Sequence, residues 1–162
     1  MRDIDIDSFA IYVGASEEAV ARAIPRAAAA GFHTVRLRFD DLESVDELDV
    51  YLAHTFQYPW KTRGLNAAVD MISDLGWLAP ARGYLFLASG CGSSEVAKAL
   101  GWVVPSIIDR WRSRGRWCVF ALEGRSAVFE AEAVAASAEL EAASHLPWVA
   151  PGTGPVPLID AS

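Results

Sequence analysis

Four short runs rich in β-branched and aromatic residues recur along the chain, and a helix-like segment separates each run from the next. They cover residues 9–13, 33–39, 83–88 and 117–122. A parallel strand pair needs a long crossover connection, so strands that alternate with helices indicate a mainly parallel sheet covered by helices. The sequence therefore predicts an α/β fold with a small parallel sheet, in which three strands are joined by an additional N-terminal strand.

The segments between these runs carry helix signals of different quality. Helix 45–56 is the best specified, because Ser44 and Glu47 form a capping box and apolar residues recur along one face. Helices are also expected over residues 94–103 and 127–144. Pro105 removes a backbone donor, and it predicts a second short helix after the first. The tail over 151–162 is expected to be irregular.

Charge narrows the class of partner. The net charge is −7 and the sequence pI is near 4.9, which disfavours direct binding of nucleic acid and suits a basic protein. No apolar run reaches the roughly 18–20 residues of a membrane span, so no membrane insertion is expected. Acidic residues replace the bases of a secretory signal at the N-terminus, which predicts a cytoplasmic location. Cys91 and Cys118 lie in no ligand-spaced array, and no metal site or cofactor is expected.

Segment 65–78 is predicted to be an amphipathic helix. At about 100° per residue, Leu65 begins an apolar face that recurs at helical spacing and points toward the core. The opposite stripe contains five residues: Asn66, Asp70, Ser73, Asp74 and Trp77. The preceding loop adds Tyr58 and Trp60, and aromatic residues beside carboxylates are typical of protein interfaces. An ordinary solvated face is the alternative for the carboxylates.

This region resembles the barstar family of ribonuclease inhibitors. The stretch YPWKTRGLNAAVDMISDLGWLAPARGYLFL is similar to the family's aromatic-Pro loop, acidic helix, Asp-Leu-x-Trp-Leu segment and strand. The resemblance implies a barstar-like three-layer domain over 33–124. Residues 1–32 form a strand–helix extension of it, and 125–162 form a C-terminal helix and tail. We expect all three to make one compact unit.

The resemblance also implies a function without catalysis. A barstar-like chain binds a basic ribonuclease and occludes its active site. Asp70 would occupy the enzyme's phosphate-binding site and meet its catalytic Arg, Lys or His side chains. Asn66 stands where the family usually has Asp, and Trp60 and Trp77 match family aromatics. The implied partner-binding residues are Trp60, Lys61, Gly64, Asn66, Val69, Asp70, Ser73, Asp74 and Trp77.

Two alternatives stay open. Lys61 and Arg63 place bases beside the acidic segment, and Arg110 lies where the family can supply another acid. These departures favour an interaction module with a non-nuclease partner. The loop 90–94 follows a strand and precedes a helix, as a phosphate cradle would. It lacks a complete glycine-rich motif, so a βα turn with a serine cap competes with a nucleotide-binding loop.

Overall fold

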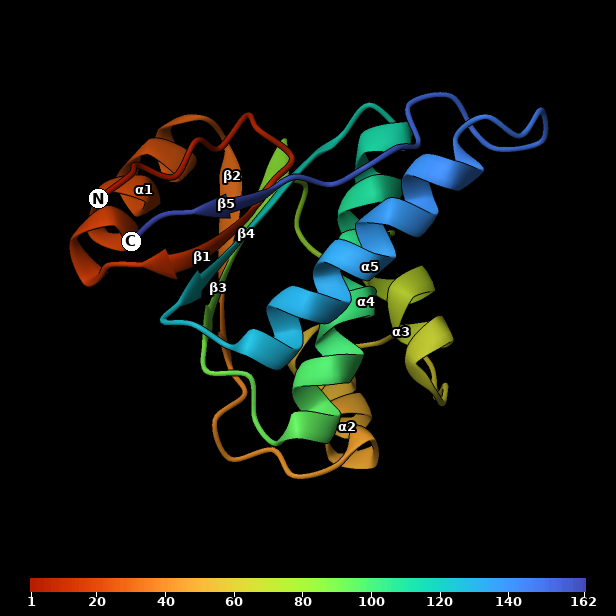
Figure 1. The fold of residues 1–162 in the computed structure, drawn as a ribbon, viewed down its shortest axis with the longest axis horizontal. Coiled ribbons are helices and arrows are strands. Elements are labelled where there is room, and N and C mark those ends of the chain that lie inside the picture. Colours follow the sequence, from red (N-terminus) through yellow and green to blue (C-terminus); the bar gives the residue numbers. More distant parts are fainter.

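A five-stranded, all-parallel sheet organises the protein in the computed structural model, which describes residues 1–162 (Figure 1). The strands are β1 (Ile11–Ala15), β2 (Phe32–Arg38), β3 (Gly83–Ser89), β4 (Trp117–Glu123) and β5 (Leu158–Asp160). Their order across the sheet is β2-β3-β4-β1-β5. The predicted α/β fold and its four strands are confirmed, and the sheet has one strand more than the sequence indicates.

Helices cover both faces of this sheet. They are α1 (Glu17–Ala29), α2 (Val45–Thr55), α3 (Leu65–Ile72), α4 (Ser94–Ser113) and α5 (Ala127–Ala143). In Figure 1, α1 lies on one side of the strands and the other four helices lie on the opposite side. Serine side chains at positions 16, 44, 93 and 126 accept backbone N–H groups and fix the start of every helix except α3.

The expected break at Pro105 is wrong. Helix α4 runs without interruption from Ser94 to Ser113, although Pro105 cannot donate to the carbonyl of Gly101. Most of α4 is buried, since the sheet lies on one side and α5 on the other. The apolar area buried along this helix outweighs the one hydrogen bond that Pro105 removes.

The expectation of an irregular tail is wrong for residues 158–160. Strand β5 pairs in parallel with β1, and the flanking hydrogen bonds run from Ile11 N to Pro157 O (2.9 Å) and from Ala161 N to Val13 O (2.8 Å). Prolines at 155 and 157 obscure this strand in the sequence, yet they are compatible with the start of an edge strand. Because β1 lies between β4 and β5, both terminal segments are built into the sheet.

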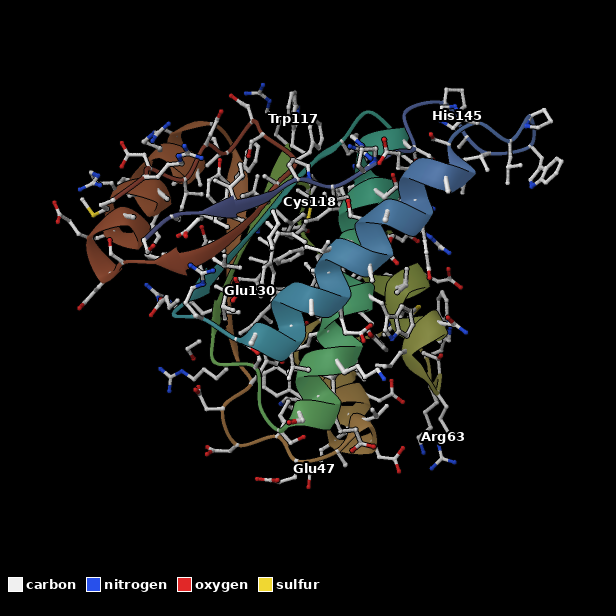
Figure 2. All side chains as sticks on the ribbon, viewed as in Figure 1. Glu47, Arg63, Trp117, Cys118, Glu130 and His145 are labelled. Atoms are coloured by element: carbon white, nitrogen blue, oxygen red, sulfur yellow. The ribbon has the colours of Figure 1, made fainter.

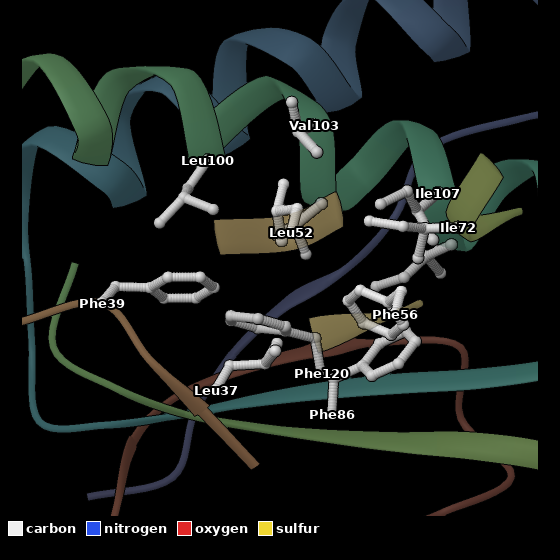
Figure 3. Close-up of a pocket in the computed structure, with 12 residues that line it drawn as sticks. Leu37, Phe39, Leu52, Phe56, Ile72, Phe86, Leu100, Val103, Ile107 and Phe120 are labelled. Atoms are coloured by element: carbon white, nitrogen blue, oxygen red, sulfur yellow. The ribbon is translucent and has the colours of Figure 1, made fainter. Parts of the chain in front are cut away.

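Two apolar clusters fill the spaces between these layers. The larger contains 31 buried residues from α2–α5 and one face of the sheet, and the smaller contains 14 from α1, the N-terminal segment and the other face. The larger cluster encloses a cavity of about 20 Å³ lined only by apolar side chains from the sheet, α2, α3 and α4 (Figure 3). A cavity this small and apolar is a packing void. None of the helices has the length and apolar character that a membrane crossing requires.

Candidate protein-binding face

Helix α3 is shorter than predicted. It ends at Ile72, because Leu75 adopts a positive φ of 51° and turns its buried side chain back toward the core. Side chains from α4 and its C-cap residue pair with the free carbonyls at this end of the helix. Trp111 Nε1 donates to the carbonyl of Ile72 (2.9 Å), and Arg114 Nη1 donates to that of Ser73 (2.7 Å). The continuous polar stripe predicted over 66–77 therefore does not form.

The nine implied binding residues divide into two groups. Val69 and Ser73 are buried, so their side chains are not available to a partner; Val69 packs in the core, and Ser73 is held where the helix ends. Six residues are exposed and Trp77 is half-buried. The candidate face is defined here as Trp60, Lys61, Gly64, Asn66, Asp70, Asp74 and Trp77.

The aromatic part of this face is held in place. Trp77 Nε1 donates to the carbonyl of Phe56 at the end of α2 (2.9 Å). The rings of Tyr58 and Trp60 lie 6.4 and 6.5 Å from that of Trp77. Trp60 is nonetheless 63% exposed. An indole with most of its surface in water, next to a second indole that is held by a hydrogen bond, offers a partner a large contact area.

An open hollow adjoins Trp60 and was not predicted. It lies between α2 and the loop before α3, and its lining residues are Asp49, Val50, Ala53, His54, Tyr58, Trp60, Lys61, Thr62 and Arg63. The Tyr58 hydroxyl is buried without a hydrogen-bond partner, and burial raises its pKa. Asp49 accepts the Gly64 N–H (2.9 Å), which positions the start of α3. The one sequence signal for this hollow is Val50, an apolar residue that lies off the apolar face of helix 45–56 and is exposed in the structure.

Charge on the candidate face is mixed, because the exposed carboxylates of Asp70 and Asp74 share it with Lys61. Asp70 forms an ion pair with Arg110 of α4, and both side chains are largely exposed. Exposed bases also lie near both ends of α3, with Lys61 and Arg63 in the loop before it and Arg114 at its C-cap residue Ser73. Figure 2 shows Arg63 projecting outward from the segment before this helix. An incoming cation must therefore compete with Arg110 for Asp70.

The loop 90–94 packs as a βα turn. Ser93 caps α4 by accepting the Val96 N–H (3.3 Å), and its own N–H donates to the carbonyl of Leu42 (2.9 Å). A Cβ at Gly92 would lie 2.6 Å from that same carbonyl. Glycine is required at position 92 because segment 39–43 of the chain packs directly against it. The same segment takes up the Ser93 N–H, which a phosphate-binding loop would offer to its ligand.

Cys91 in this loop is expected to be unreactive at neutral pH. Burial raises the pKa of its thiol to about 11, so the thiolate that attacks an alkylating agent is scarce below that value. Iodoacetamide labelling, measured by mass spectrometry, should stay slow at pH 7–8 and accelerate as the pH approaches 11. Rapid labelling of Cys91 at pH 7 in the folded chain would contradict this.

Comparison with known proteins found no match: no family model, no curated protein and no solved structure matches the chain.

Proposed function

We propose that this chain is a non-catalytic inhibitor that binds a basic ribonuclease through the candidate face and occludes its active site. The observation that supports this most is that the candidate face combines an exposed indole, that of Trp60 next to the hydrogen-bonded Trp77, with the exposed carboxylate of Asp70 on α3. Interface hot spots combine an aromatic anchor with groups that can be desolvated against a partner. When the complex forms, the ion pair of Asp70 with Arg110 is replaced by ion pairs of Asp70 with cationic side chains in the ribonuclease active site.

The geometry also explains why α3 can serve as a rigid support for Asp70. The buried face of α3 belongs to the larger apolar cluster. Both of its ends are anchored, by Asp49 at Gly64 and by Trp111 at Ile72. A carboxylate on a fixed helix loses little entropy on binding, which favours affinity.

The test is to titrate a panel of basic microbial ribonucleases with three forms of the chain: wild type, Asp70→Asn and Glu17→Gln. Glu17 is an exposed carboxylate on α1, on the opposite side of the sheet from α3, so its variant matches the charge change away from the candidate face. We expect Asp70→Asn to weaken inhibition by about tenfold or more and Glu17→Gln to leave it unchanged. Equal inhibition by all three forms would remove Asp70 from the mechanism.

The ion pair between Asp70 and Arg110 favours a second candidate, an interaction module with a non-nuclease partner. With Asp70 paired to Arg110, Asp74 is the one unpaired carboxylate of the face. It is balanced by Lys61 and the neighbouring Arg63, which suits a less basic protein. Arg110→Met separates the two candidates. This variant removes the ion-pair partner of Asp70, so it should tighten ribonuclease inhibition if the chain is a ribonuclease inhibitor. The interaction module is preferred if neither wild type nor Arg110→Met inhibits any ribonuclease and the protein that co-purifies with the chain is not a nuclease.

A further inference from the structure

Helix α5 is apolar on the side that faces solvent as well as on the side that packs. Its exposed residues include Ala127, Val128, Ala131, Val134, Ala135, Ala138 and Ala142. At 100° per residue these positions share one arc of about 120° with no charged side chain inside it. Val134 is 57% exposed and Val128 is 39% exposed. Helices that are apolar all round are normally buried, so this face lacks a cover in the isolated chain.

A hollow extends the same face toward the C-terminus. It lies between α5 and the segment leading into β5, and its lining residues are Val134, Ser137, Ala138, Glu141, Pro155, Val156, Pro157 and Leu158. The Ser137 hydroxyl fixes this segment against the helix, since it accepts from Val156 N (2.7 Å) and donates to Val156 O (3.0 Å). The helix and the hollow therefore form one preformed surface.

The helix is also held firmly on its inner side. Phe129 and Ala133 are buried, and the Phe129 ring lies 5.8 Å from that of Phe120 in β4. Gly101 of α4 leaves room for α5 to approach closely, because a Cβ there would lie 3.0 Å from the Phe129 carbonyl. Rotation of α5 to hide its outer face would break this packing.

The charges beside the apolar arc identify the kind of cover. On the helical projection Glu132 and Glu139 border it on one side, and Glu130 and Glu141 border it on the other. Figure 2 places Glu130 and His145 near opposite ends of the helix. No Lys or Arg follows Arg125 in the sequence, and Arg125 is already engaged by Glu130 and Asp160. Two copies of this face would oppose carboxylates to carboxylates, which disfavours self-association.

We propose that the outer face of α5 docks a basic amphipathic helix from a partner protein. The apolar side of that helix would cover Val134 and the alanines, and lysines or arginines at its margins would meet Glu132 and Glu139 on one side and Glu141 on the other. This surface lies on the far side of α5 from α4, so it is distinct from the candidate face and does not depend on the ribonuclease proposal.

The probe is a synthetic, fluorescently labelled amphipathic peptide of leucine and lysine, paired with a peptide that carries glutamate in place of every lysine. Anisotropy with the full chain should show binding of the lysine peptide at least about tenfold tighter than of the glutamate peptide. Val134→Asn should weaken that binding by about tenfold, since it places a polar group at the centre of the apolar contact. Glu139→Lys/Glu141→Lys should also weaken it and should improve binding of the glutamate peptide.

The matched control is Asp7→Lys/Glu17→Lys, which makes the same charge change at exposed sites on the α1 side of the sheet, away from α5. If this control weakens lysine-peptide binding as much as the α5 double variant, the attraction is non-specific and the proposal fails. It fails equally if Val134→Asn has no effect on peptide binding. A concentration-dependent dimer in sedimentation experiments that Val134→Asn dissolves would assign the face to a second copy of the chain instead.

Discussion

Trp111→Ala is expected to lower the free energy of unfolding by about 3–5 kcal/mol. The side chain is fully buried in α4, and its ring lies 5.3 Å from that of Tyr84 in β3. Its indole N–H donates to the carbonyl of Ile72, where α3 ends. The substitution therefore opens a cavity in the larger core and leaves a buried carbonyl unpaired, and each of these is destabilising.

Urea denaturation followed by circular dichroism measures this loss. Trp148→Ala is the matched control, because Trp148 is 78% exposed and its removal should change stability by less than about 0.5 kcal/mol. If Trp111→Ala costs no more than the control, Trp111 does not join α3 to α4 as the structure indicates. The same variant should weaken ribonuclease inhibition, since α3 positions Asp70.

Gly101→Ala is expected to lower the free energy of unfolding by about 1–3 kcal/mol. Alanine is the better helix former by about 1 kcal/mol, so an isolated α4 would gain stability from this change. In the folded chain the new methyl group would press against Glu132 of α5 and lie 3.0 Å from the Phe129 carbonyl. Because backbone atoms at a packed helix crossing move little, the steric cost exceeds the gain in propensity.

The control for this prediction is Gly76→Ala. Gly76 is exposed, and a Cβ there would meet only the flexible carboxylate of Asp74, at 3.0 Å. Thermal unfolding should show a lower Tm for Gly101→Ala and little change for Gly76→Ala. A Tm that rises for Gly101→Ala would mean that α5 does not pack on α4 at this crossing.

The central fold could be predicted from the sequence because its signals are local. Strands β3 and β4 are continuous apolar runs, as expected where helices cover both faces of a parallel sheet, and β2 at the sheet edge carries β-branched and aromatic residues between exposed polar ones. The capping of α2 by Ser44 is also predicted correctly, since the Glu47 N–H donates to the serine hydroxyl (3.2 Å). Strand β5 and the unbroken α4 were not predicted, because both depend on packing against distant segments that overrides the local effect of proline.

The candidate site was predicted in part. Helical spacing correctly places Asn66 and Asp70 on the exposed side of α3. It also predicts a helix that continues beyond Ile72, so the alignment that it predicts for Ser73, Asp74 and Trp77 is wrong. The end of α3 is set by Leu75 and by donors from Trp111 and Arg114, roughly forty residues away in the sequence. Arg110 departs from the pattern of the barstar family, but its pairing with Asp70 depends on how α3 and α4 cross.

Occlusion of a ribonuclease active site is tested most directly by competition with a ligand of that site. Calorimetric titration of an inhibited ribonuclease with the chain should be performed with the enzyme free and with the enzyme saturated by a nucleoside 3′-monophosphate. If Asp70 occupies the phosphate site, the nucleotide should weaken binding of the chain by about tenfold or more. Unchanged affinity for the nucleotide-loaded enzyme would show that the chain binds elsewhere and would contradict the proposed function.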